Sequence, residues 1–273
     1  MAKLSASRNP VKAIIAAESG TGKTGALWSL ADAGFRLRIY DADAGTNILA
    51  SALRDKPEAM DRVEVLTLAD ELIKDSISGY VKPKGGKGRA WPGLMDALNK
   101  WPDDPDGKGA GDWGTDTVVV IDSLTLFSKA ALRFAMGIEG FGKGTPWKPA
   151  LHHYGTAMPQ IEGLFALLYN VDCHVIWLTH VSNTSDEDGN FTGAFPSSIG
   201  QALNSVIPRY VNNILTIKVQ GAKRILSTKP TTNRIITKTE DLTVRDEYLL
   251  SEGKTSHPGL REFFADCGWE SPT

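Results

Sequence analysis

The chain contains few cysteines, no long apolar run and almost no net charge. Only two of its 273 residues are cysteines, Cys173 and Cys267, which excludes a disulfide-stabilised scaffold and a four-cysteine zinc site. No stretch approaches the roughly 20 apolar residues that a membrane helix requires. Residues 1–8 lack the apolar core of a secretion signal. These absences predict a soluble, cytoplasmic protein with no membrane partner.

The charges of the chain nearly cancel. With 30 basic and 32 acidic side chains, the formal net charge is −2. This excludes a uniformly basic, histone-like surface but leaves room for a local basic groove. The length is sufficient for one large domain or two small ones.

Short apolar runs alternate with helical patterns along most of the chain. Runs typical of buried strands occupy residues 13–17, 36–40, 63–66, 118–121 and 175–178, and residues 23–33 have a helical pattern. Strands interleaved with helices predict an α/β fold with a mostly parallel central sheet flanked by helices. From residue 213 onward, apolar and polar residues alternate, which predicts antiparallel C-terminal strands before a last helix at residues 260–264.

We expect residues 1–273 to form one domain with additions. Residues 74–116 are rich in glycine, proline and charge, apart from a short helix expected near residues 92–101. This composition predicts a flexible insertion that cannot pack into a core. Residues 181–198 predict a polar loop, and residues 237–273 form a C-terminal extension.

The strongest motif is a glycine-rich loop between the first strand and the first helix. Its sequence, AESGTGKT, matches the phosphate-loop pattern except that alanine replaces the first glycine. Backbone N–H groups of such a loop surround a β-phosphate, Lys23 would reach the β- and γ-phosphate oxygens, and the Thr24 hydroxyl would bind Mg²⁺. The motif predicts ATP and Mg²⁺ as ligands. The expected nucleotide-binding residues are Ala17, Glu18, Ser19, Gly20, Thr21, Gly22, Lys23, Thr24 and Gly25.

Hydrolysis requires carboxylates beside this loop. The most apolar strand ends in Asp122, which we expect to hold the metal through a bound water. Asp41 and Asp43 follow the second strand, and either could face the γ-phosphate; loop solvation or helix capping is the alternative for both. The adjacent His152 and His153 lack spaced carboxylate or cysteine partners, which favours a loop or helix cap over a metal site.

Four segments together resemble the RecA-like family of phosphate-loop ATPases. They are AESGTGKT, the strand ending in Asp41-Ala42-Asp43, the strand ending in Asp122-Ser123, and the strand ending in Thr179-His180. The resemblance covers roughly residues 10–230 and is closest to small phage-encoded nucleotide-binding proteins, some of which act in single-strand annealing and recombination.

The resemblance implies a role for each of these positions. Asp43 matches the family's glutamate that orients the attacking water, and Asp122 matches the metal-strand aspartate. His180 matches the sensor residue that couples the γ-phosphate to the loop behind it. The implied catalytic residues are Lys23, Asp43, Asp122 and His180, with Thr24 and Asp122 at the metal. Asp43 is one methylene shorter than glutamate, which leaves slow hydrolysis or a non-hydrolytic switch open. For His180 the alternative is an ordinary strand-end histidine.

In RecA-like proteins, the loops after the metal strand and the sensor strand face DNA. Here the first would span residues 137–149 and present Phe141, Lys143, Trp147 and Lys148, since cations and aromatics suit single-stranded DNA. The second would span residues 181–198, whose acidic residues would repel phosphate. The basic stretch at residues 82–89 is a further candidate, with a solvated loop as its alternative.

RecA-like ATPases usually act at subunit interfaces, where a basic residue reaches the neighbour's γ-phosphate. The resemblance offers Arg224 and Lys229 for this role in trans, with solvated strand cations as the alternative. It implies a homo-oligomer, either a ring or a filament, and a single-strand-binding protein as a further candidate partner.

The sequence favours an ATP-binding and ATP-hydrolysing RecA-like protein that acts on single-stranded DNA in recombination, annealing or replication. If phage-encoded, it would act in the cytoplasm of the host cell. Three alternatives stay open: a nucleotide-gated switch that binds no DNA, a helicase-like motor, and a small-molecule kinase with a lid from residues 74–116. The Asp122-Ser123 strand and His180 disfavour the kinase.

Overall fold

The computed structural model describes residues 9–76, 79–140, 147–185, 188, 191–230, 237–239, 241 and 243–272. The strands are β1 (Lys12–Ala16), β2 (Arg36–Asp41), β3 (Val63–Thr67), β4 (Leu72–Lys74), β5 (Val81–Pro83), β6 (Thr117–Asp122), β7 (His174–Thr179), β8 (Val181–Ser185), β9 (Phe191–Pro196), β10 (Asn213–Gln220), β11 (Lys223–Ser227), β12 (Glu247–Glu252) and β13 (Thr255–Ser256). The α-helices are α1 (Lys23–Ala26), α2 (Trp28–Asp32), α3 (Asn47–Ala52), α4 (Pro57–Met60), α5 (Ala90–Asn99), α6 (Leu124–Glu139), α7 (Leu151–Tyr169), α8 (Gln201–Val206) and α9 (Gly259–Asp266). Two 3₁₀ turns, η1 (Lys84–Gly86) and η2 (Ile207–Tyr210), complete the elements of the described chain.

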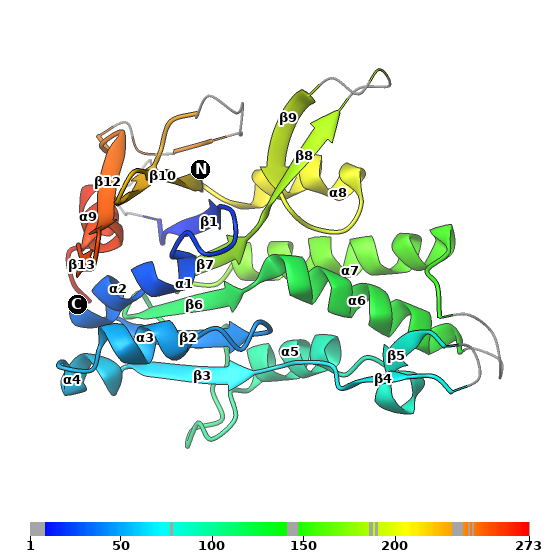
Figure 1. Ribbon diagram of the computed structural model, residues 1–273. Coiled ribbons are helices and arrows are strands. Elements are labelled where there is room, and N and C mark those ends of the chain that lie inside the picture. Colours follow the sequence, from blue (N-terminus) through cyan, green and yellow to red (C-terminus); the bar gives the residue numbers. More distant parts are fainter. Residues whose placement is uncertain are drawn as a thin grey trace, which may run out of the picture.

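A large mixed sheet organises the fold (Figure 1). Within the described residues, its strand order is β13-β12-β11-β10-β1-β7-β6-β2-β3. The strands from β10 to β3 are parallel, and β11, β12 and β13 are antiparallel. The predicted α/β class, with a mostly parallel sheet and antiparallel C-terminal strands, is confirmed. One detail differs, because β10, expected to be antiparallel, pairs in parallel with β1.

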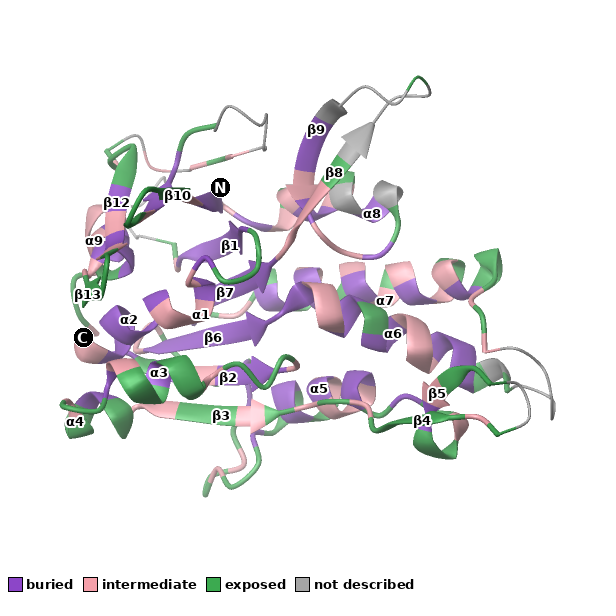
Figure 2. Ribbon diagram, in the orientation of Figure 1, coloured by how far each residue is buried: buried purple, intermediate pink, exposed green. Residues whose placement is uncertain are grey.

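Helices cover both faces of this sheet. Along β1, Ile14 and Ala16 pack into a cluster with α5, α6 and α7. Ala13 and Ile15 pack into a second cluster, with α1 to α4 and α9. Because side chains alternate between the faces of a strand, an apolar residue at every position marks a strand buried on both sides. The central strands β6 and β7 are accordingly buried throughout (Figure 2).

Part of the segment at residues 74–116 belongs to the core, so the prediction that it cannot pack is wrong for residues 90–101, 110 and 113. The expected short helix is present as α5, and it buries Trp91, Leu94 and Leu98. Trp101 and Trp113 are also buried, and the Arg38 guanidinium lies 5.2 Å and 5.5 Å from their ring centroids. The apolar residues of α5 recur at helical spacing and face the sheet, while the glycines and prolines lie mostly in the flanking turns.

Residues 181–198 differ from the expected polar loop. They contain the antiparallel hairpin β8–β9, in which Val181 pairs with Pro196 and Asn183 with Ala194. Figure 1 shows this hairpin projecting from the body of the protein. The strand signal at Ile235 and Ile236 lies outside the described residues. No described helix combines the length and the apolar character needed to cross a membrane.

Candidate nucleotide-binding site

The parallel register brings the four motif-bearing strands to one edge of the sheet. Ala16 of β1 pairs with Thr179 of β7, and Asp122 of β6 pairs with Leu178 of β7 and with Asp41 of β2. Four carboxyl ends, those of β1, β2, β6 and β7, therefore lie side by side at one edge of the sheet. Open α/β sheets bind their ligands at this edge.

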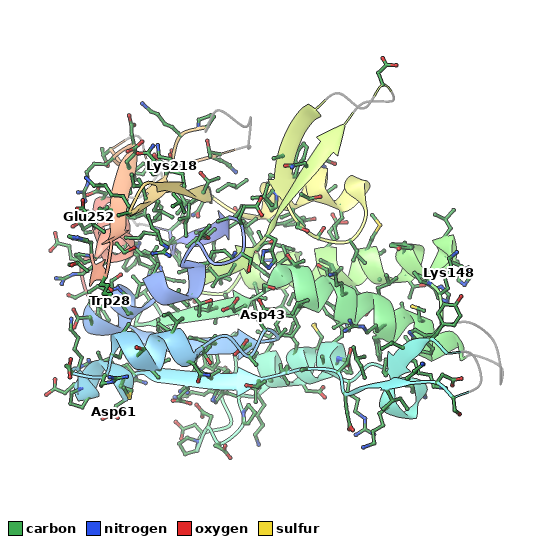
Figure 3. The ribbon with its side chains drawn as sticks, in the orientation of Figure 1. Trp28, Asp43, Asp61, Lys148, Lys218 and Glu252 are labelled. Carbon is green, nitrogen blue, oxygen red and sulfur yellow. The ribbon has the colours of Figure 1, made fainter. Side chains whose placement is uncertain are left out.

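A cavity of about 650 Å³ lies at this edge. Its walls come from the phosphate loop, α3, the strand ends and the C-terminal strands. The lining residues are Ser19, Gly20, Gly22, Lys23, Thr24, Gly25, Ala26, Trp28, Asp43, Gly45, Ile48, Ser51, Ala52, Asp122, His180, Arg224, Leu250, Ser251, Gly253, Lys254 and Ser256. Figure 3 labels Trp28 and Asp43, which belong to this wall.

The phosphate loop has the backbone that its glycines allow. Gly20 and Gly22 adopt φ angles of +76° and +93°, a region that favours glycine. Lys23 is folded into the loop, where its Nζ donates hydrogen bonds of 2.9 Å to the carbonyl oxygens of Ala17 and Glu18. Burial lowers the pKa of Lys23 from its usual value, and nearby Asp122 opposes this effect. The loop therefore positions the Lys23 ammonium group where it can bind an anion.

Thr24 and Asp122 form the metal-binding candidate. The Thr24 hydroxyl donates a 2.7 Å hydrogen bond to Oδ2 of Asp122, although 98 residues separate them in sequence. Burial raises the pKa of the Asp122 carboxyl to about 6, while the bond from Thr24 works in the opposite direction. Hydroxyl and carboxylate oxygens are ligands that suit Mg²⁺, which typically takes one or two carboxylates and completes its shell with water and phosphate. The residues present fit this ion.

The structure distinguishes Asp43 from Asp41. Asp41 is fully buried and its two carboxylate oxygens accept hydrogen bonds from the Asp43 N–H, at 2.8 Å, and the Thr46 hydroxyl, at 3.3 Å. Asp43 instead lines the cavity, where its Oδ1 accepts a 3.3 Å hydrogen bond from Ser123. Asp41 therefore shapes the turn, and Asp43 is the carboxylate that is available to a ligand.

His180 lines the cavity at the end of β7 and is linked to the β8–β9 hairpin. Its backbone N–H donates to Thr125 Oγ1 at 3.2 Å, and its carbonyl accepts from the Ser197 N–H at 2.7 Å. The neighbouring Thr179 hydroxyl donates to the Ser197 carbonyl at 2.8 Å. Burial, with a smaller effect of Lys23, lowers the pKa of His180. The imidazole is therefore favoured in its neutral form beside the phosphate loop.

Other predicted site residues lie away from the cavity. Trp147 and Lys148 follow α6 near the start of α7, and Figure 3 shows Lys148 far from Asp43. Phe141 and Lys143 lie outside the described residues. Lys229 forms an exposed 2.7 Å ion pair with Asp246.

The remaining candidates fall into three groups. Ala17, Glu18 and Thr21 belong to the loop, and Thr21 donates a 2.8 Å hydrogen bond to the Glu18 carbonyl. Arg224 lines the cavity of its own chain. His153 accepts a 2.8 Å hydrogen bond from the Ala150 N–H through its Nδ1, which confirms the helix-cap alternative.

Sequence reasoning missed part of the cavity wall. Ile48 and Ala52 of α3 belong to it, as do Leu250, Ser251 and the turn at residues 253–256. These residues belong to no motif, and those after residue 249 lie in the expected C-terminal extension. Only the pairing of β11 with β12 brings that extension beside the phosphate loop.

Comparison with known proteins identifies the family. A family model described as an AAA domain matches residues 9–239. The structure resembles the crystal structure of the RadB recombinase, with a TM-score of 0.48, 14% sequence identity and coverage of 90% of each chain. No curated protein matches the sequence. The family match spans most of the chain and includes the whole phosphate loop, so this chain belongs to the AAA-domain family of nucleotide-binding ATPases.

Proposed function

We propose that this protein hydrolyses Mg-ATP and couples that reaction to single-stranded DNA, in recombination or annealing. The observation that carries the proposal is the convergence of Lys23, the Thr24–Asp122 pair and Asp43 on one cavity. The role in recombination or annealing rests on the resemblance of the four motif-bearing segments to small phage-encoded RecA-like proteins.

Each residue has a chemical task in this proposal. Lys23 exchanges its two carbonyl partners for phosphate oxygens, and Thr24 and Asp122 hold the ion. When bound, Mg²⁺ supplies charge neutralisation at the phosphates. Asp43 accepts a hydrogen bond from the attacking water and orients it, while Ser123 fixes the carboxylate through its 3.3 Å hydrogen bond. His180 donates a hydrogen bond to the terminal phosphate from its neutral ring.

Helix α6 offers a rigid link from this site to the candidate DNA surface. It begins at Leu124, two residues after Asp122, and its 16 residues extend to Glu139. That corresponds to about 24 Å at 1.5 Å per residue. Figure 3 places Lys148, the sequence neighbour of Trp147, at the end of the protein where α6 ends. A shift at the metal strand can therefore reach the first candidate DNA loop through one element.

A second basic segment lies at the same end of α6. The backbone at residues 86–88 packs against the last turns of the helix, since a Cβ added at Gly137 would lie 3.0 Å from the Lys87 Cα. Lys82 and Lys84 are ion-paired with Asp75 and Glu71. Within the described chain, the exposed Lys87 and Arg89 make no ion pair. Cations and an aromatic ring thus gather at one end of the protein, which favours a single strand as ligand.

Coupling is tested by ATP turnover with and without a single-stranded oligonucleotide at two salt concentrations. We expect stimulation that weakens as salt rises, because phosphate contacts release counterions. The double variant Lys87→Ala/Arg89→Ala should lose most of the stimulation. A matched control, Lys100→Ala/Lys108→Ala, removes two exposed cations from the loop after α5 and should retain it.

Two other outcomes would change the proposal. Turnover that is unaffected by DNA would favour the nucleotide-gated switch. If the wild-type protein did not bind Mg-ATP, the proposal as a whole would be contradicted. Lys23→Ala, which should not bind Mg-ATP, is the negative control for this measurement. Mass photometry of the same samples tests the predicted ring or filament, and a titration with a single-strand-binding protein tests that candidate partner.

A further inference from the structure

Arg224 lies on the opposite side of the phosphate loop from the metal-binding candidate. In the sheet order, β11 is two strands from β1 on one side, and β6, which carries Asp122, is two strands from β1 on the other. Arg224 is near the start of β11, at the same edge as the phosphate loop, and it lines the cavity of its own chain. A bound phosphate chain would therefore lie between Arg224 and Asp122.

The Arg224 stem rests on a loop glycine. A Cβ added at Gly22 would lie 3.2 Å from the Arg224 Cδ and 3.7 Å from its Nε. Gly22 directly precedes Lys23. The absence of a side chain there lets the arginine approach the backbone that would surround the phosphates.

The Arg224 guanidinium has few hydrogen-bond partners among the described residues. Its Nε is buried without a hydrogen-bond partner, and Nη1 has one long contact of 3.4 Å with Ser251 Oγ. Among the described residues, no carboxylate forms an ion pair with it. A buried, unpartnered donor on a charged group is costly. An anion with two oxygens spaced to accept from the guanidinium N–H groups, such as a phosphate, would remove that cost.

We infer that Arg224 binds the α- and β-phosphates of the nucleotide held by its own subunit, rather than a neighbour's γ-phosphate. The inference rests on the proposed nucleotide site. In the sheet order, β11 with Arg224 lies between β6 with Asp122 and β12 with Leu250, so we expect Arg224 beside the phosphates that are not transferred. Lys229, two residues beyond the other end of β11 and paired with Asp246, remains the candidate for action in trans.

The test compares Mg-ADP and a non-hydrolysable Mg-ATP analogue by calorimetric titration. The Arg224→Met variant keeps an apolar stem over Gly22 but loses the guanidinium. We expect affinity for both nucleotides to fall by the same factor, about tenfold to a hundredfold, as for the loss of a charged hydrogen bond. KM for ATP should rise by more than kcat falls. Arg224→Lys should recover part of the affinity.

The matched control is Lys223→Met, which removes the adjacent cation. Lys223 is about half exposed and pairs with Glu252, so its loss should leave both affinities unchanged. Thermal unfolding of the nucleotide-free variants checks that each one folds.

Unchanged ADP affinity with lost turnover in Arg224→Met would overturn the inference, because that pattern belongs to a residue acting in trans. Recovered turnover on mixing Arg224→Met with Lys23→Ala subunits would overturn it as well. Both results leave wild-type binding intact, which separates them from a failure of the proposed function itself.

Discussion

Replacing Asp122 by asparagine should stabilise the nucleotide-free protein. Asp122 is only 2% exposed, and burial raises its pKa from an ordinary value of 3.8 to about 6. Because the pKa is higher in the folded chain, the folded state holds its proton more tightly. The free energy of unfolding therefore falls as pH rises from about 4 to 6. Above pH 6 the stability lost by ionising Asp122 stays constant. Function is thus expected to keep a carboxylate that destabilises the fold.

The magnitude follows from the shift. Two pKa units at about 1.36 kcal/mol each give a cost of about 3 kcal/mol at pH 7.5. At pH 4.5, the same two pKa values give a loss of unfolding free energy of only about 1 kcal/mol. Asp122→Asn keeps the shape and an oxygen that can accept from Thr24, so it should gain these amounts of stability. The gain is an upper bound, since an amide accepts a weaker hydrogen bond than a carboxylate does.

Urea unfolding in EDTA at the two pH values measures this effect. The control is Asp61→Asn, an exposed aspartate at the end of α4, which should change stability by less than about 0.5 kcal/mol. In separate samples that contain Mg²⁺ and no EDTA, saturating Mg-ATP should reverse the order, because a ligand at 1,000 times its Kd adds about 4 kcal/mol to the wild-type protein. A loss of stability in Asp122→Asn, or a gain that is the same at both pH values, would refute the reasoning.

Three further predictions follow from the packing and the hydrogen bonds. Leu94→Ala should lower the free energy of unfolding by about 2–5 kcal/mol, because Leu94 is fully buried on α5; an effect as small as that of Leu72→Ala, at a residue 44% exposed, would contradict the place of α5 in the core. Thr179→Val removes the hydrogen bond to the Ser197 carbonyl, which links the end of β7 to the segment after the β8–β9 hairpin; if this hairpin also takes part in coupling, the stimulation of turnover by DNA should fall while ADP affinity is unchanged, and full stimulation would exclude the hairpin from coupling. Trp147→Ala should weaken binding of a labelled single strand in fluorescence anisotropy, and unchanged anisotropy would remove that residue from the DNA surface.

The order of elements and the phosphate end of the site could be predicted from the sequence. The apolar runs that became β1, β6 and β7 are buried throughout, which makes their pattern strong. The strands β2, β6 and β7 each end in a polar residue. The parallel register then determines that Lys23, Asp43, Asp122 and His180 share one edge. Asp41 and Asp43 could not be separated in advance, because the hydrogen bonds that occupy Asp41 come from Asp43 and Thr46 in the folded turn.

Contacts between distant segments could not be predicted. Glycine, proline and charged residues in the turns dominate the composition of residues 74–116. For this reason the helix was expected but its packing against the core was not. The hairpin β8–β9 pairs two short strands with weak alternation, because β8 is polar after Val181 and β9 contains a glycine and a proline. The resemblance offers Arg224 for action on a neighbouring subunit. Its position over Gly22 could not be predicted, because it depends on where β11 lies in the sheet. The wall formed by Leu250 and the turn at residues 253–256 likewise depends on tertiary pairing.

The most direct test of the central claim is the steady-state rate of phosphate release from saturating Mg-ATP by wild-type protein and Asp43→Asn. Asp43 lines the cavity and should orient the attacking water. We predict that Asp43→Asn binds Mg-ATP as the wild type does and releases phosphate at least about 100-fold more slowly, as for the loss of a positioned acid–base group. Wild-type turnover in Asp43→Asn would contradict the account.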